Sequence, residues 1–461
     1  MTADSRRAWL TVVLFVTACV SMYAQDFIGN TKPVMTVTPD KTTGLNAIYV
    51  VYNTSGVGMQ YTSKNGRSDV TWYKYSAQGG AYAEVISDIK REGTTSTLEQ
   101  IIPNMGYYIE DGTDRYYFWV VNYADYAMTL NSISISSSSD CDWLALDIAS
   151  DKAGAIYYYT ILGKQMVLGR DITISYDTQT ADEQNMIYNR ETKSVTREYL
   201  KSTEQVTAPL CSTDITIRGD RFREYWGETQ TMTYSGYSPQ AVQVRSKAEA
   251  TDGTTPTEGD NTVTFSGSAP FEVTFTGIVS EGCTHYEWQF ARDKAFSDML
   301  YRFIDEKERT YTFSEAGTFY VRFMGADQSN TCIHYGTEDT DSKGALKSKV
   351  YVVNIGESEL KIPNVFSPLY QDGINDVWKV RYKSLVEFDC RIYNKQGMEL
   401  CHFTDPDDGW DGRFGGKFVP TGAYYYVIIA RGADGKTYKK AGDINIISYK
   451  KSSSSSSDQS E

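Results

Sequence analysis

The sequence is poor in histidine and proline, and beyond its first 24 residues it has no long hydrophobic run. Only 3 histidines and 11 prolines occur among 461 residues. The histidines, His285, His334 and His402, have no partner at the spacing of a metal site or a catalytic triad. No later segment reaches the roughly 18 consecutive apolar residues of a transmembrane helix. These absences predict a non-enzymatic mature chain without a cofactor or a transmembrane helix.

Positive charge is also scarce. The chain has 45 basic and 59 acidic residues, a formal net charge of −14, and no cluster of Lys and Arg interrupts this balance. The negative electrostatic field of such a chain repels the phosphate backbone of a nucleic acid, so we expect no nucleic-acid partner.

The abundant residues are those of strands and turns. Tyr and Gly each occur 36 times, and short runs of β-branched and aromatic residues alternate with turns that contain Gly, Asn or Asp. The length suggests about three domains rather than one large core. We therefore predict an all-β chain of tandem Ig-like β-sandwich domains after an N-terminal signal peptide.

The N-terminus has the pattern of an export signal. Two arginines precede an apolar run over 9–16, and the small residue Ala24 precedes Gln25. The segment that ends at Cys19 also resembles a lipobox, in which this cysteine would carry a lipid. Of the two interpretations, we favour cleavage after Ala24.

Changes of composition divide the chain into segments. The predicted segments are a signal peptide (1–24), an N-terminal β-sandwich (26–140), a second β-domain (141–245), a linker rich in Thr, Gly, Glu and Asp (246–261), an Ig-like domain (262–356), a C-terminal β-sandwich (360–450) and a disordered Ser-rich tail (451–461).

Six cysteines remain after the signal peptide, an even number that suits disulfides in an exported protein. If 394–397 forms the loop of a hairpin, Cys390 faces Cys401 at a distance that a disulfide can bridge. Two further pairings, Cys283 with Cys332 and Cys141 with Cys211, rest only on neighbourhood in the sequence.

The third predicted domain contains an Ala-Pro step before its first core strand and the later run Tyr311-Thr312-Phe313-Ser314-Glu315-Ala316-Gly317-Thr318-Phe319-Tyr320-Val321. In this order the two features resemble an Ig-like domain of the polycystic-kidney-disease (PKD) type. The resemblance implies a role in spacing or interaction, and a fold by itself fixes no activity.

The C-terminal segment carries an ordered series of turn and core motifs. They contain Pro363, Asn364, Phe366, Pro368, Asp372, Gly373, Asn375, Asp376, Asn394, Gly397, Gly409, Trp410, Asp411, Gly412, Pro420, Gly422 and Tyr425. This series resembles the gliding-motility-associated C-terminal domain, the type B sorting signal of the type IX secretion system. The resemblance implies export through the periplasm and the type IX translocon, and docking on an outer-membrane barrel protein. It also implies display at the cell surface or outer membrane, or release from the cell.

One departure from that family is the motif before Asp372, where Leu369-Tyr370-Gln371 replace the usual Asn-Gly. Two oxygen-rich loops nearby are weak candidates for Ca²⁺ ligands, and the competing interpretation is ordinary Asx turns. Their candidate ligands are Asp372, Asn375, Asp376, Asp405 and Asp407.

The leading hypothesis is an exported interaction protein that is either secreted by the type IX secretion system or an accessory of it. Two alternative functions remain. A surface adhesin or glycan-binding protein would display an exposed aromatic platform on the domain at 26–140. A secreted hydrolase would need two carboxylates about 5 to 10 Å apart in a cleft of the N-terminal half. The tripeptide Arg218-Gly219-Asp220 matches an integrin-binding motif, but we interpret it as the end of a strand.

Overall fold

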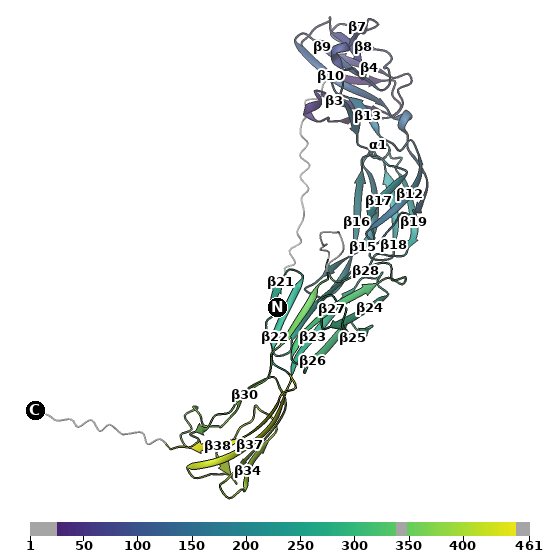
Figure 1. Cartoon of the computed structure of the whole chain (residues 1–461). Helices are drawn as coiled ribbons and strands as arrows, with labels where there is room; N and C mark the ends of the chain where they lie inside the picture. Colours follow the sequence, from purple (N-terminus) through teal and green to yellow (C-terminus); the bar gives the residue numbers. More distant parts are fainter. Residues whose placement is uncertain (1–24, 338–347, 449–461) are drawn as a thin grey trace, which may run out of the picture.

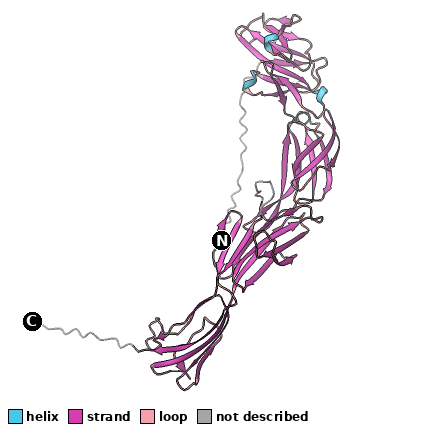
Figure 2. Cartoon of the chain, viewed as in Figure 1, coloured by secondary structure: helices cyan, strands magenta, loops and turns pink. Residues whose placement is uncertain are grey.

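The computed structural model describes residues 25–337 and 348–448. Its regular secondary structure is almost entirely strands, with few helices (Figure 2), which confirms the predicted all-β fold class. Four β-sandwiches follow one another along a curved rod, with the N-terminal sandwich at one end and the C-terminal sandwich at the other (Figure 1). The predicted signal peptide, Cys19 and the Ser-rich tail lie outside the described residues.

The first sandwich packs a four-stranded sheet of order β1-β4-β8-β7 against a six-stranded sheet of order β2-β3-β10-β9-β5-β6. Its elements are β1 (Gln25–Ile28), β2 (Met35–Val37), η1 (Lys41–Thr43), β3 (Ala47–Val51), β4 (Gly58–Thr62), β5 (Thr71–Tyr75), η2 (Gly80–Tyr82), β6 (Glu84–Val85), β7 (Lys90–Glu92), β8 (Thr95–Leu98), β9 (Met105–Asp111), β10 (Asp114–Asn122) and η3 (Tyr123–Tyr126).

The six-stranded sheet is covered on both faces. All five residues of β3 are buried, as expected for a continuous apolar run rather than an alternating one. Tyr49 and Val51 face the partner sheet, whereas Ile48 and Val50 belong to a second core on the opposite face. Residues of the next domain complete this second core, so the first two domains share hydrophobic packing.

The second sandwich packs the sheet β11-β12-β17 against the sheet β16-β15-β18-β19. Its elements are β11 (Thr129–Ile135), β12 (Trp143–Asp151), β13 (Ile156–Tyr159), β14 (Gln165–Leu168), β15 (Ile172–Asp182), β16 (Ile187–Arg197), β17 (Thr203–Thr207), β18 (Thr213–Gly219), α1 (Arg221–Tyr225) and β19 (Gln230–Tyr237). The predicted boundary at residue 140 is wrong, because β11 already pairs with β12. In addition, Ile156, Leu168 and Phe222 pack against the first domain.

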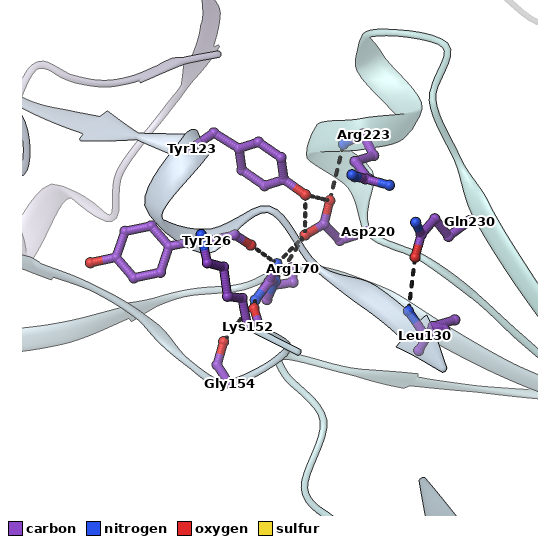
Figure 3. A network of polar contacts seen from close by, with 9 residues as sticks. All are labelled: Tyr123, Tyr126, Leu130, Lys152, Gly154, Arg170, Asp220, Arg223 and Gln230. Atoms are coloured by element: carbon purple, nitrogen blue, oxygen red, sulfur yellow. Dashed lines mark hydrogen bonds and ion pairs between the residues drawn. The ribbon is translucent and has the colours of Figure 1, made fainter. Parts of the chain in front are cut away.

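A buried ion pair lies where these two domains meet (Figure 3). Arg170 Nη2 and Asp220 Oδ2 are 2.7 Å apart, and neither side chain is exposed to solvent. Arg170 also donates to the carbonyls of Tyr126 and Gly154, at 2.6 and 3.0 Å. Asp220 accepts from the Tyr123 hydroxyl at 2.9 Å. Because every charged group has a bonded partner, the pair fixes the joint without leaving a buried charge uncompensated.

The third sandwich packs the sheet β20-β23-β26 against the sheet β21-β22-β29-β27-β24-β25, to which β28 is added beside β27. Its elements are β20 (Val244–Ala250), β21 (Thr257–Gly259), β22 (Thr262–Gly267), β23 (Phe271–Val279), β24 (His285–Ala291), β25 (Met299–Ile304), β26 (Glu308–Phe313), β27 (Gly317–Ala326), β28 (Ile333–His334) and β29 (Val350–Ile355).

The predicted linker at 246–261 is wrong, because its residues form strands of this third domain. Strand β20 pairs with β23 from Val244 to Ala250, and β21 pairs with β22. The segment has too few apolar residues to fold alone, but neighbouring strands satisfy its backbone and Ser246 accepts a hydrogen bond from the Tyr351 hydroxyl at 3.0 Å.

A disulfide links the second and third domains. It joins Cys141 to Cys332 across 191 positions of sequence, whereas Cys211 and Cys283 are free and buried. The predicted pairings of Cys141 with Cys211 and of Cys283 with Cys332 are therefore wrong. Each assumed that a disulfide stays inside one domain, but the end-to-end arrangement brings Cys141 and Cys332 together at the joint.

The fourth sandwich has a main sheet of order β31-β38-β37-β33-β34 and two small ribbons, β30-β32 and β35-β36. Its elements are β30 (Glu359–Lys361), β31 (Val365–Phe366), β32 (Arg381–Lys383), β33 (Leu385–Tyr393), β34 (Glu399–Phe403), β35 (Arg413–Phe414), β36 (Lys417–Phe418), β37 (Gly422–Gly432) and β38 (Thr437–Ile446). It has its own core, but Val386 and Ala433 pack against the third domain. The Ala269 amide also donates to the buried Ser384 hydroxyl at 3.2 Å.

We expect Arg170→Met to destabilise the chain by about 3 to 5 kcal/mol, because it leaves the Asp220 carboxylate buried and unpaired. Urea unfolding followed by circular dichroism measures this change. The matched control is Arg190→Met, which removes an exposed ion pair with Asp177 and is expected to cost at most about 1 kcal/mol. Equal losses for the two variants would contradict a special role of the buried pair.

We also expect four free thiols and one disulfide in the protein that starts at Gln25. Alkylation of the denatured, unreduced protein should label Cys211, Cys283, Cys390 and Cys401, and a peptide map should contain a linked pair of Cys141 and Cys332. Labelling of all six cysteines, or a peptide that links two other cysteines, would contradict this arrangement.

Candidate functional site in the C-terminal domain

The sequence motifs of the C-terminal domain form its core. Trp378 and Trp410 lie in a two-residue bridge, and each backbone amide donates to the carbonyl of the other, at 2.9 and 3.0 Å. Their indole N–H groups donate to the carbonyls of Pro363 and Arg413, at 2.7 and 3.0 Å. The Trp410 ring also packs edge-on against Tyr424, with centroids 5.2 Å apart. The motif thus builds a two-tryptophan centre with satisfied polar atoms.

The glycines and turn residues of the motif shape the loops around this centre. Asn394 Oδ1 accepts from the amides of Gln396 and Met398, both at 3.0 Å, and Gly397 has a positive φ of 81° in the same turn. At Gly412, also at positive φ, an added Cβ would lie 2.7 Å from the ring of Pro368. These residue types follow from backbone geometry and close packing.

The five predicted Ca²⁺ ligands lie in two loops. Several of their oxygens accept hydrogen bonds from the protein, whereas Asp376 Oδ1 is buried and has no hydrogen-bond partner. Asp372 and Asp376 accept from the backbone amides of Ile374 and Gly373, at 3.0 and 2.7 Å. The Asn375 carbonyl accepts from an amide at 2.8 Å.

In the second loop, Asp405 accepts from the Asp407 amide at 2.9 Å, and Lys379 Nζ donates to the Asp407 carbonyl at 2.9 Å. No group of three or more His, Cys, Asp or Glu side chains suited to a metal occurs in 25–337 or 348–448. The contacts of Asp372 and Asp405 are those of Asx turns, as the competing interpretation expects.

The predicted disulfide between Cys390 and Cys401 is wrong. A β-bulge next to Ile392 shifts the register, so Cys401 lies opposite Ile392 and Cys390 lies opposite Phe403. Both thiols are free. Burial raises the pKa of Cys390 to about 12, so its thiol stays protonated in the core.

The outer face of the main sheet has an exposed apolar stripe that sequence analysis missed. It consists of Tyr425, Val427 and Ile429, three alternate residues of the central strand β37, whose exposed fractions are 46%, 40% and 52%. The residues between them, such as Ile428, face the core. The signal in the sequence is the unbroken apolar run at 424–430, which resembles a strand covered on both faces although only one face is covered.

Charged side chains border this stripe on one side. Asp389 and Arg391 on β33 lie opposite Ile429 and Val427. His402 Nε2 lies 2.8 Å from Asp389, and Arg391 is 3.2 Å from the same carboxyl group. The contact with His402 is the largest cause that holds the pKa of Asp389 below its usual range, and Arg391 adds to it. The stripe therefore has an apolar centre and an ion-paired border, as interaction surfaces often do.

Exposed apolar side chains are concentrated in this domain. The structure describes 23 exposed large hydrophobic residues, and 11 of them lie in 360–448, which is less than a quarter of the described chain. Among these 11 residues, Tyr425, Val427 and Ile429 lie side by side on one face of β37.

The first domain does not present the open aromatic platform that the adhesin hypothesis requires. Tyr73 and Tyr108 stack with centroids 4.3 Å apart, but Tyr108 is 9% exposed and Tyr73 is half-buried. The single exposed aromatic residue that the structure describes in 26–140 is Tyr82. The tripeptide at 218–220 is also unavailable as a binding motif, since Asp220 is buried.

Two family models match parts of the chain. Residues 133–234 match a fibronectin type III domain, and residues 360–446 match the CHU_C type IX secretion signal domain. The C-terminal resemblance seen in the sequence is thereby confirmed, and it marks the protein for export to the cell surface or secretion. Neither match extends over 262–356, where the PKD-like resemblance stays a prediction. No curated protein matches the chain.

Three solved structures match the chain at low identity. A tetra-tandem repeat from the extending region of a large adhesion protein is 10% identical, with a TM-score of 0.22, over 86% of this chain and 96% of that chain. An adhesin that is stabilised by Ca²⁺ and helps an Antarctic bacterium bind ice is 11% identical, with a TM-score of 0.18, over 86% and 95%. Fibronectin(III)-like modules of Clostridium thermocellum CbhA are 8% identical, with a TM-score of 0.17, over 43% and 94%. Scores this low support no functional conclusion.

In the described ranges, no helix is long and apolar enough to cross a membrane.

We expect Trp410→Ala to destabilise the C-terminal domain by about 3 to 5 kcal/mol, because it empties the centre shared with Trp378. Hydrogen exchange of the full chain should show faster exchange in peptides from 376–430 and unchanged exchange in the first domain. Phe414→Ala, at a side chain that is 46% exposed, is the control and should leave exchange unchanged. Unaltered protection in the Trp410 variant would contradict the assigned role.

Proposed function

We propose that this protein is cargo of the type IX secretion system and acts at the cell surface by binding rather than by catalysis. The observation that carries this proposal is the secretion-signal match at 360–446, which coincides with a sandwich that has its own core. In the proposed arrangement, this domain directs passage through the translocon, and the other three sandwiches extend an interaction surface away from the envelope.

We further propose that the apolar stripe of β37 docks on an outer-membrane barrel protein of the secretion machinery. Docking would cover Tyr425, Val427 and Ile429 and would leave the paired charges of Asp389 and Arg391 at the rim. The burial of such a stripe is favourable at roughly 25 cal/mol per Å² of apolar surface.

Two of the three histidines have structural rather than catalytic contacts, and this supports a binding role. His334 Nδ1 accepts from the backbone amides of Val244 and Gly336, at 3.2 and 3.0 Å. His402 is held by Asp389 on the surface of the main sheet. Neither arrangement resembles the pairing of a nucleophile with a base.

Cell fractionation tests the proposal. Deletion of 360–461 should leave the protein in the periplasm, because the proposed address is lost. The double variant Val427→Lys, Ile429→Lys should lower the surface fraction by about tenfold, because two charges in the stripe oppose its burial. The double variant is needed because the deletion also removes Val386 and Ala433 from the core of the third domain.

The matched control is Phe414→Lys, which puts a charge at an exposed aromatic residue of the other sheet, in β35. It should reach the surface normally. Normal delivery of the deletion variant would refute the sorting role, and normal delivery of the double variant would refute the docking face alone. If the deletion variant is delivered normally but the cells export other cargo proteins poorly, the protein is a component of the machinery instead.

A further inference from the structure

The hairpin β15–β16 extends beyond the sandwich to which it belongs. Its strands pair over their whole length, from Ile172 with Arg197 to Asp182 with Ile187, but β18 pairs with β15 only at 173–175. The far half of the hairpin therefore projects toward the third domain. There Glu183 forms an ion pair with Arg245 of β20, at 3.0 Å.

This projection forms one wall of a groove of about 610 Å³ at the joint of the second and third domains. Thr180, Glu191 and Lys193 line the wall, Trp143 at the start of β12 lies at the other side, and Gln243 and Arg245 come from the third domain. Joints between domains are common places for ligand sites, because neither domain alone has to form the concave surface.

We propose that this groove binds a neutral carbohydrate chain. Trp143 is 49% exposed, an unusual position for a large aromatic side chain, and its flat indole suits the apolar face of a sugar ring. Threonine, glutamine and charged side chains around it donate and accept the hydrogen bonds that sugar hydroxyls need.

The charges of the groove favour a neutral ligand over an anionic one. Glu183 and Arg245 neutralise each other, Glu191 and Lys193 add one charge of each sign, and Asp142 leaves a formal excess of one negative charge in the lining. The net charge of the whole chain, −14, opposes a polyanion.

The acids of the groove fit binding rather than hydrolysis. Glu191 accepts from the Thr180 hydroxyl at 2.6 Å, and Glu183 is held by Arg245. These two carboxylates therefore bond groups of the protein, whereas a glycosidase needs a pair of carboxyl groups directed at the glycosidic bond.

The groove is fixed before a ligand arrives. The disulfide between Cys141 and Cys332 closes one end of the joint, and Cys141 itself lines the groove. The Glu281 amide donates to Gln179 at 2.8 Å, and Glu281 accepts from the Ser212 amide at 3.0 Å, so both domains are tied together beside it. A rigid site loses little entropy when it binds, which favours affinity for a flexible sugar chain.

The test uses the purified protein from Gln25 onward and a panel of neutral hexasaccharides: cellohexaose, xylohexaose, mannohexaose and chitohexaose. Titration calorimetry and tryptophan fluorescence should detect binding of at least one of them. Trp143→Ala should weaken that binding by about tenfold or more, and Thr180→Val by less. The control is Tyr301→Ala, which removes an equally exposed aromatic residue of β25 (49%) outside the groove and should leave binding unchanged.

The circular dichroism spectrum and an intact Cys141–Cys332 peptide verify that each variant is folded. The proposal is overturned if no neutral hexasaccharide binds, if Trp143→Ala binds as tightly as the unmodified protein, or if only polygalacturonate or an unstructured peptide binds. Because the protein is purified, these outcomes are independent of its export route, and a failure here leaves the proposed secretion intact.

Discussion

The buried ion pair between Arg170 and Asp220 fixes the first two domains relative to each other. The shape of this protein depends on such joints, because each domain has a small core of its own. A sandwich of about 100 residues has only a modest core of its own. Arg170 donates to carbonyls of two segments, at Tyr126 and Gly154, and Asp220 accepts from the Tyr123 hydroxyl and, at the start of α1, from the Arg223 amide at 3.0 Å. One ionic cluster thereby orders the end of the first domain and the edge of the second.

The other two joints use different chemistry for the same purpose. A disulfide and the contacts of Glu281 fix the second to the third, and the buried hydroxyl of Ser384 with the apolar contacts of Val386 fixes the third to the fourth. A chain built in this way holds its outer domains at a distance from its C-terminal end. This geometry suits an exported protein whose last domain carries the secretion signal and whose other domains meet a partner.

The two proposed interaction surfaces lie where the sandwiches are left uncovered. The stripe of β37 is open because the small ribbons of the C-terminal domain cover only the inner face of the main sheet. The groove beside Trp143 is open because β15 and β16 extend beyond the strand β18 that pairs with β15. In the first place an uncovered sheet face exposes the residues, and in the second place the length of two strands does. Neither surface is formed by a long loop.

The strand-rich fold and the family of the C-terminal domain could be predicted from the sequence alone. Alternation, turn residues and motif order are local properties, and they survive without knowledge of which strand pairs with which.

Four features became visible only in the tertiary structure: the pairing of the disulfide, the strands within 246–261, the strand register at Cys390 and the groove. Each depends on contacts between distant residues: Cys141 meets Cys332 across a joint, β20 becomes a strand because β23 offers it backbone partners, and a single bulge moves Cys401 away from Cys390. A one-residue shift or a domain contact leaves no periodic signal in the sequence, because it arises from packing rather than from local preference.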